Sequence, residues 1–365
     1  MELAAPEIDA IELWRFPLRM VRPFVTAHGV QHDREILLVR VVAGDDEGWG
    51  ECGAFAEPTY TADYAASAYH VLQRWLIPAT LAQPAFEWPA IKGHQMAKAA
   101  LQGALLDVAL RRDDRSLASL LGGTRQRVVA GVAVGIAPTI DALLLEVAEY
   151  VNLGYTRIKL KIEPGYDVEP VRVVRETFGD RLSLQVDANG SYVGRRDELQ
   201  ALDDYGLLFV EQPLGDDDLV GHAALAQHLQ TPICLDEAIP SAAIADAALA
   251  LGACSIVNVK AARVGGYLEA KAVHDVVMAR RGTLWCGGML ETGVGRAAAL
   301  AVASLPGCTL PADLSASDRY WADDITAPFV LRDGGLDVPA GAGIGVTVRR
   351  DAVRNAAVET FRRER

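Results

Sequence analysis

The sequence predicts an α/β fold, in which a parallel β/α barrel follows a smaller α+β domain, on three observations. From Val128 onward, short apolar runs alternate with stretches long enough for a helix, which is typical of parallel α/β proteins. Charged residues close several of these runs in succession, at nearly even spacing. Before Val128 the order differs, because strand patterns come first and helical patterns follow.

Length and composition fit two domains with a substantial core. The chain has 365 residues, 51% hydrophobic and 23% charged, which excludes global disorder. The net charge of −13 argues against nucleic-acid binding, which favours a basic face. We also expect no membrane span and no signal peptide, because neither apolar pattern is present. Five scattered cysteines without a Cys-x-x-Cys favour reduced thiols and a cytoplasmic location.

The first domain is expected to span residues 1–124. Alternating or continuous apolar residues predict its strands, and apolar residues at three-four spacing predict its helices. The expected elements are strands Ile8–Leu18 and Glu35–Val42, a turn at 44–48, loops at 22–29 and 53–60, and helices from Ala62 and over Met96–Leu110.

The barrel is expected to span residues 125–320. Its apolar runs suit strands that are buried on both faces of a parallel sheet. The expected strands are Val128–Val134, Ile158–Ile162, Leu182–Val186, Leu207–Val210, Ile233–Leu235, Ile256–Val259 and Leu284–Cys286, with helices over Thr139–Leu153, Asp217–Leu229 and Ala242–Leu251.

Charged residues end successive strands at a regular interval. Lys161, Asp187, Glu211, Asp236 and Lys260 are 26, 24, 25 and 24 residues apart, about one βα unit each. In a β/α barrel the carboxyl ends of the strands share one face, where catalytic groups gather. A doubly wound sheet would also bind ligands at strand ends, but no Gly-x-Gly-x-x-Gly follows the first strand, and the even repeat favours closure.

Lys159 and Lys161 are two residues apart on the expected strand Ile158–Ile162, so both side chains project to one face. A solvated edge strand would carry such a pair without any function. Because Lys161 begins the regular series of strand ends, we interpret the pair as one wall of a pocket.

Asp187, Glu211 and Asp236 end three consecutive strands and are therefore expected to be neighbours. Converging carboxylates repel one another unless a cation lies among them. Hard oxygen ligands without Cys or His suit Mg²⁺, with Mn²⁺ as a substitute. The alternative is that each carboxylate caps a strand end or forms an ion pair.

Lys161 and Lys260 flank the carboxylates and are expected to face each other across them. Burial and nearby cations lower the pKa of an ammonium group into the range of a useful base, and Mg²⁺ and Lys159 beside Lys161 would provide these conditions. Two such groups beside a metal suit abstraction of a proton α to a carboxylate, which gives a metal-stabilised enediolate. The alternative has both lysines paired with the carboxylates.

These residues resemble the muconate-lactonizing branch of the enolase superfamily. Longer motifs resemble, within it, the o-succinylbenzoate synthase/N-succinylamino acid racemase family. The likeness spans nearly the whole chain and implies a modified TIM barrel with an N-terminal α+β capping domain, completed by C-terminal residues 321–365 that pack back on it. The motifs are Ile158–Pro170, Val186–Asn189, Glu211–Leu214, Thr231–Glu237, Lys260–Tyr267, Trp285–Gly293 and Ala312–Tyr320.

The resemblance implies Mg²⁺ on the three carboxylates, with Lys161 and Lys260 as acid/base groups on opposite faces of a small carboxylate substrate. In racemisation of N-succinyl- or N-acylamino acids, one lysine takes the α-proton and the other returns one. In the dehydration that forms o-succinylbenzoate for menaquinone, Lys161 is both base and acid, and Lys260 stabilises the intermediate as a cation. Relatives also imply a homo-oligomer, a dimer or an octamer.

Four further residues receive roles from the same resemblance. Lys159 is expected to tune Lys161 and to help hold the substrate carboxylate. Asn189 and Glu237 are expected behind the metal ligands. Arg263 matches an arginine of the racemase-containing subgroup, which favours dual activity.

The capping loops around Phe24 and Phe55 are expected to close over the pocket and set specificity, or alternatively to pack the domain interface. Gly288, Met289 and Leu290 are expected at the substrate site. A muconate-type cycloisomerase or a dipeptide epimerase is the alternative within the superfamily. The Asp-x-Asp expected of an epimerase near the last strand is absent.

Overall fold

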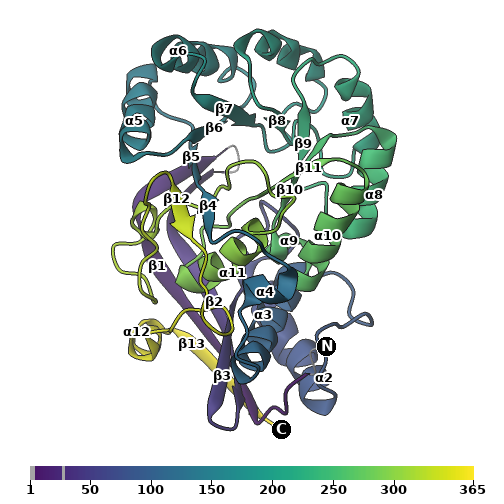
Figure 1. Ribbon diagram of the computed structural model, residues 1–365, viewed down its shortest axis with the longest axis vertical. Helices are drawn as coiled ribbons and strands as arrows, with labels where there is room; N and C mark the ends of the chain where they lie inside the picture. Colours follow the sequence, from purple (N-terminus) through teal and green to yellow (C-terminus); the bar gives the residue numbers. More distant parts are fainter. Residues whose placement is uncertain (1–4, 27–28) are drawn as a thin grey trace.

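The structure, a computed structural model, describes residues 5–26 and 29–365. Its larger sheet is parallel and seven-stranded, and strands β5 to β11 are neighbours in sequence order. A four-stranded sheet in the order β13-β1-β2-β3 occupies the other half of the molecule (Figure 1). The chain therefore has the two expected parts, a parallel α/β part and an α+β part.

The four-stranded sheet is antiparallel and joins the two ends of the chain. The last strand pairs with β1 from Ala10 opposite Glu364 to Arg15 opposite Glu359. C-terminal residues thus complete the capping sheet, as the family resemblance predicted. The strands are β1 Ala10–Thr26, β2 Gly29–Ala43, β3 Asp46–Glu51 and β13 Glu359–Glu364.

The loop expected at 22–29 is wrong for its described residues, because β1 continues to Thr26 and β2 begins at Gly29. Residues 27–28 lie outside the described part of the chain. Strand β13 pairs with β1 only as far as Arg15. Beyond Arg15, the edge of β1 that faces away from β2 has no strand partner among the described residues. Prolines such as Pro17 and Pro23 are tolerated on such an edge.

Helix α3 packs closely on the capping sheet through two glycines of β3. A Cβ at Gly50 would lie 2.0 Å from the carbonyl oxygen of Ala100, and one at Gly48 would lie 2.1 Å from that of Ala104. Only a bare backbone allows this approach. The helices of the capping half are α1 Ala65–Val71, η1 Leu72–Leu76, α2 Ile77–Ala82, α3 Gln95–Arg112 and α4 Leu117–Leu121.

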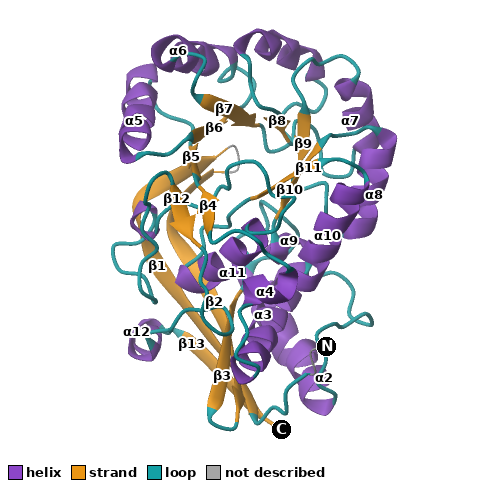
Figure 2. Ribbon diagram, viewed as in Figure 1, coloured by secondary structure: helices purple, strands orange, loops and turns teal. Residues whose placement is uncertain are grey.

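The parallel half alternates strand and helix, with the helices outside the curled sheet (Figure 2). Helix α5 starts after Thr139, whose hydroxyl accepts a hydrogen bond from the Ala142 amide. The strands are β5 Gly131–Val134, β6 Arg157–Lys161, β7 Ser183–Asp187, β8 Val210–Glu211, β9 Ile233–Leu235, β10 Ile256–Val259 and β11 Thr283–Cys286. The helices are α5 Ile140–Leu153, α6 Val168–Phe178, η2 Arg196–Tyr205, α7 Leu219–Ala226, α8 Ala242–Leu251, α9 Ala261–Val264, α10 Tyr267–Ala279 and α11 Gly293–Ala303.

An irregular segment, residues 308–313, closes the sheet between its first and last strands. On one side Cys308 bridges Leu284 of β11, and on the other Ala312 bridges Ala130 just before β5. The predicted modified barrel is therefore confirmed, with this segment in the eighth position. The domain boundaries at 124 and 320 stay predictions. The remaining elements are β4 Arg127–Val129, η3 Ser317–Arg319, β12 Gly335–Asp337 and α12 Arg350–Ala356.

Two further expectations from the sequence, on the state of the cysteines and on membrane spans, can be compared with the structure. All five cysteines are buried and free of disulfides. Within the part of the chain that the structure describes, none of the helices combines the length and apolar character needed to cross a membrane.

A buried carboxylate fastens the two halves together. Glu51, at the end of β3, accepts hydrogen bonds from the backbone amides of Thr292 (3.0 Å) and Gly295 (2.9 Å) and from the Thr292 hydroxyl (2.6 Å). It thereby caps the N-terminus of α11 from the other domain. Burial raises the pKa of Glu51 to about 7 despite these bonds, and nearby Glu291 adds to the increase.

We expect the contribution of Glu51 to folding stability to fall as the pH rises from 4.5 to about 7, because the folded state holds a proton on Glu51 that the unfolded chain releases. The proton's contribution is fully present below the lower value and lost above the upper, and it is at most about 3 kcal/mol. Urea unfolding at about pH 5 and about pH 8 should show a weaker pH dependence in Glu51→Gln than in wild type. The exposed control Glu87→Gln should keep the wild-type dependence. Equal dependence in wild type and Glu51→Gln would contradict the assignment.

Candidate active site

Strand β6 presents both lysines of the Lys-x-Lys pair on one face. Lys159 and Lys161 alternate with Ile158 and Leu160, and all of these residues are buried. The Nζ atoms of Lys161 and Lys159 lie 2.7 and 3.2 Å from the same oxygen, Oδ2 of Asp187. The two lysines are therefore not exposed side chains of an edge strand, and they point to the same face, as strand periodicity predicts.

The three carboxylates are brought together, but each is paired with a cation. Asp187 contacts both lysines of β6, Glu211 Oε2 lies 3.3 Å from Lys159 Nζ, and Asp236 Oδ2 lies 2.7 Å from Lys260 Nζ. In the described part of the chain, no three His, Cys, Asp or Glu side chains are grouped as they would be around an ion. The ion-pair alternative left open by the sequence thus describes this structure.

The carboxylates nevertheless repel one another. Burial first, and then Asp187 and Asp236, raise the pKa of Glu211 to about 7, although Lys159 opposes this. Burial also acts against the charge on Asp187, but Lys161 and Lys159 hold its pKa well below the usual range. Hard oxygen donors of this kind fit a divalent ion such as Mg²⁺.

Lys260 directly follows β10 and is held by two groups. Its Nζ donates to Asp236 Oδ2 at 2.7 Å and to the Tyr60 hydroxyl at 3.0 Å. Burial lowers its pKa, but the charge of Asp236 outweighs burial and keeps the pKa well above its ordinary value. Its nearest charged partner is thus a carboxylate, and the lowered pKa expected of a catalytic lysine beside Mg²⁺ stays a prediction.

Lys159 is also held by carboxylates. Its Nζ lies 2.7 Å from Asp313 Oδ2. Burial opposes its charge, but Asp313, Glu211 and Asp187 together raise its pKa well above the ordinary value. The pKa of Asp313 is lowered in turn to about 2, because Lys159 and Arg157 outweigh its burial. Lys159 is thus a fixed cation.

Sequence reasoning missed two residues of this cluster, Tyr60 and Asp313. Asp313 directly follows the segment that closes the barrel, and it lies within the motif Ala312–Tyr320. Its position at the end of a short apolar stretch was the available signal. Tyr60 lies in the loop expected at 53–60, and no spacing there indicated a contact with Lys260.

Asn189 and Glu237 lie together beside Lys161. The lysine Nζ donates to Asn189 Oδ1 at 2.6 Å, and Asn189 Nδ2 donates to Glu237 Oε1 at 2.8 Å. The other oxygen of Glu237 is buried without a hydrogen-bond partner. Burial, Asp236 and Asp187 raise the pKa of Glu237 to about 8. Glu237 is therefore a second carboxyl of raised pKa close to the strand-end carboxylates.

Arg263 is a second cation on Asp236. Its Nε lies 3.0 Å from Asp236 Oδ1, and its terminal nitrogens donate to the carbonyls of Ile239 and Asn258. Asn258 in turn donates to Glu211 Oε1 at 2.7 Å. Arg263 therefore supports the strand ends that carry two of the carboxylates.

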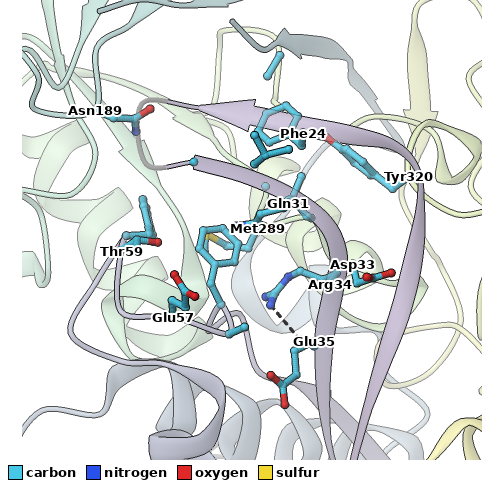
Figure 3. Close-up of a pocket in the computed structure, with 18 of the residues that line it drawn as sticks. Phe24, Gln31, Asp33, Arg34, Glu35, Glu57, Thr59, Asn189, Met289 and Tyr320 are labelled. Atoms are coloured by element: carbon cyan, nitrogen blue, oxygen red, sulfur yellow. Dashed lines mark hydrogen bonds between the residues drawn. The ribbon is translucent and has the colours of Figure 1, made fainter.

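A cavity of about 360 Å³ lies over this cluster, between the β1–β2 hairpin and the barrel (Figure 3). Phe24 and Phe55 line it from the capping half, and Gly288, Met289 and Leu290 line it from the barrel. Phe24 also belongs to the hydrophobic core, so its packing role and its place at the cavity coexist. Contact of these residues with a substrate stays a prediction.

Two family models match the chain along most of its length. Residues 10–122 match the mandelate racemase/muconate lactonizing enzyme N-terminal domain, and residues 142–352 match the enolase C-terminal domain-like family. The chain belongs to the enolase superfamily. The predicted resemblance is therefore confirmed, and the protein is an enzyme of this superfamily.

Named relatives within the superfamily cover the chain almost completely. An N-succinylamino acid racemase of Amycolatopsis sp is 54% identical over 348 residues, 93% of this chain and 95% of the relative. An o-succinylbenzoate synthase of Geobacillus stearothermophilus is 45% identical over 359 residues, 96% of each chain. A solved enolase-superfamily structure from Listeria innocua has a TM-score of 0.92 at 36% identity and covers 98% of this chain and 99% of that one.

Proposed function

We propose that this enzyme abstracts the proton α to a substrate carboxylate and racemises N-succinyl- or other N-acylamino acids. The observation that carries the proposal is the pair of buried lysines, Lys161 and Lys260, on either side of three crowded carboxylates. The high identity to a relative named N-succinylamino acid racemase supports the substrate class.

We infer Mg²⁺, with Mn²⁺ as a substitute, as the cofactor, held by Asp187, Glu211 and Asp236. Two observations support this: burial, Asp187 and Asp236 raise the pKa of Glu211, and one oxygen of Glu237 is buried without a hydrogen-bond partner. When bound, a divalent ion supplies positive charge for the substrate carboxylate and for the charge that develops as the α-proton leaves. Carboxylates used as ligands cease to be counterions of the lysines, and this favours the neutral amine over the ammonium.

Lys161 and Lys260 carry the protons in this mechanism. Strands β7, β8 and β9 separate their strands in the sheet, so we assign the two amines to opposite faces of the substrate. The neutral amine of one lysine takes the α-proton, and the ammonium of the other returns a proton from the far side, which inverts the carbon. Lys159 stays charged and helps to hold the substrate carboxylate.

Dehydration to o-succinylbenzoate, for menaquinone synthesis, is a second candidate activity. It is favoured by the 45% identity to a relative named o-succinylbenzoate synthase. Lys161 would act as both base and acid, while Lys260 would remain an ammonium that stabilises the anion. We place the enzyme in the cytoplasm, where free thiols persist. We also propose that it forms a homo-oligomer, a dimer or an octamer, as the resemblance to its relatives implies.

Deuterium uptake tests the proposal. With Mg²⁺ in D₂O, N-succinylamino acids should gain deuterium at the α-carbon and lose optical activity. Rates across a panel of N-succinylamino acids, and against 2-succinyl-6-hydroxycyclohexadiene carboxylate, would rank racemase and synthase activity. Absence of uptake while calorimetry shows bound Mg²⁺ would rule out the racemase assignment.

A further inference from the structure

Tyr60 reaches from the capping half into the lysine and carboxylate cluster. Its hydroxyl lies 3.0 Å from Lys260 Nζ and 3.1 Å from each carboxylate oxygen of Asp236. The phenol oxygen accepts from the ammonium, and the phenol proton is donated to the carboxylate. The Lys260 ammonium also lies 4.6 Å from the centre of the Tyr60 ring, within cation–π range.

The loop that carries Tyr60 is anchored to the capping sheet through Arg34 of β2. This buried arginine donates to the carbonyls of Gly53 (2.8 Å) and Ala54 (2.5 Å), and its guanidinium lies 4.7 Å from the centre of the Phe55 ring. The Phe55 and Tyr60 rings are in turn 5.8 Å apart. A continuous chain of contacts therefore runs from β2 through the loop to Lys260.

The two lysines differ in what holds them. The hydrogen bonds of Lys161 go to Asp187 and Asn189, both in the barrel. Lys260 has one partner in the barrel, Asp236, and one in the capping loop, Tyr60. Displacement of the loop would thus remove a contact from one lysine and leave the hydrogen bonds of the other intact.

We propose that Tyr60 is a positioning residue for Lys260, and that it makes proton transfer on the Lys260 face, but not on the Lys161 face, depend on the seating of the loop 53–64. The inference rests on the proposed two-lysine racemisation. Its consequence is that the capping loop controls one half of the reaction, in addition to shaping the cavity.

Isotope exchange on single enantiomers tests this asymmetry. With Mg²⁺ in D₂O, Tyr60→Phe should slow α-hydrogen exchange of one enantiomer of an N-succinylamino acid by about 10- to 100-fold, the usual cost of losing a supporting hydrogen bond. The other enantiomer should keep its wild-type exchange rate but with retention of configuration. Racemisation should slow equally in both directions, because its equilibrium constant is one. Tyr60→Leu, which also loses the ring, should be slower still on the same face.

Two variants serve as controls. Tyr64→Phe removes a hydroxyl from an exposed tyrosine of the same loop and should exchange both enantiomers at the wild-type rate. Asn189→Ala removes a barrel partner of Lys161 and should slow exchange of the opposite enantiomer. Thermal unfolding near the wild-type midpoint would show that Tyr60→Phe folds normally.

The outcomes separate this inference from the proposed function. If wild-type enzyme exchanges neither enantiomer, the proposed function is wrong. If wild type exchanges both, and Tyr60→Phe slows both equally or neither, Tyr60 does not act on one lysine and the positioning role is overturned. Slowing confined to one enantiomer, opposite to that of Asn189→Ala, is the expected result.

Discussion

Replacing Lys161 with alanine is expected to reduce both racemisation and dehydration by about 10²- to 10⁴-fold, the range typical for loss of a general acid or base. The reason is that Lys161 is assigned proton transfer in both reactions, whereas Lys260 acts as a base or acid only in racemisation. Steady-state rates with an N-succinylamino acid and with the synthase substrate provide the measurement. Synthase turnover near the wild-type rate in Lys161→Ala would disprove its assigned role.

The control for this variant is Lys271→Ala, on the outer helix α10. Lys271 forms a partly exposed ion pair with Asp275, one turn away, and loss of the Lys271 side chain should leave both rates unchanged.

Lys161→Ala should still exchange the α-hydrogen of one enantiomer, because Lys260 remains. That enantiomer should be the one whose exchange Tyr60→Phe slows, so the two variants cross-check the assignment of faces.

The strand ends could be predicted from the sequence because a barrel repeats one local rule. Each charged residue follows a buried apolar run, and parallel strands bring their carboxyl ends to the same face. Asp187, Glu211 and Asp236 needed no tertiary information beyond that rule, and the structure brings them together. Helix α8 shows the same at the level of elements, since its observed bounds equal the predicted ones.

Tyr60 and Asp313 could not be assigned in this way, because neither lies on a regular element. Tyr60 reaches Lys260 only through the packing of a capping loop against the barrel, over a separation of 200 residues. The β1–β2 hairpin was misread for a similar reason. Pro23 indicates a loop locally, while pairing of Phe24, Val25 and Thr26 with β2 extends the strand.

The charge state of the lysines depends on which partner is nearest, and spacing does not decide this. A buried lysine titrates low when cations surround it and high when a carboxylate touches it. Lys159 and Lys260 contact Asp313 and Asp236 at 2.7 Å, so their pKa values rise. The base form of Lys260 therefore requires that Asp236 be engaged elsewhere, which ties the lysine chemistry to the proposed cation.

Replacing Glu211 with glutamine is accordingly expected to weaken Mg²⁺ binding by about 10²-fold or more, since loss of even an outer-shell partner costs 10- to 100-fold. Glu211 is fully buried between Lys159 and Asn258, and burial first, then Asp187 and Asp236, raise its pKa. A divalent ion would offset both effects. Glutamine keeps the shape and an acceptor for Asn258 but loses the negative charge. Titration calorimetry with Mg²⁺ measures this without any turnover, and racemisation should fall in parallel.

Asp313→Asn is the matched control, because it makes the same chemical change at another buried carboxylate of the cavity. Asp313 pairs with Lys159 and is outside the proposed ligand set, so this variant should bind Mg²⁺ with near wild-type affinity. If both variants lost affinity equally, the net charge of the pocket rather than a defined set of ligands would hold the ion. If Glu211→Gln bound Mg²⁺ as tightly as wild type, Glu211 would not be a ligand. Only a loss specific to Glu211 assigns the cation to the strand-end carboxylates.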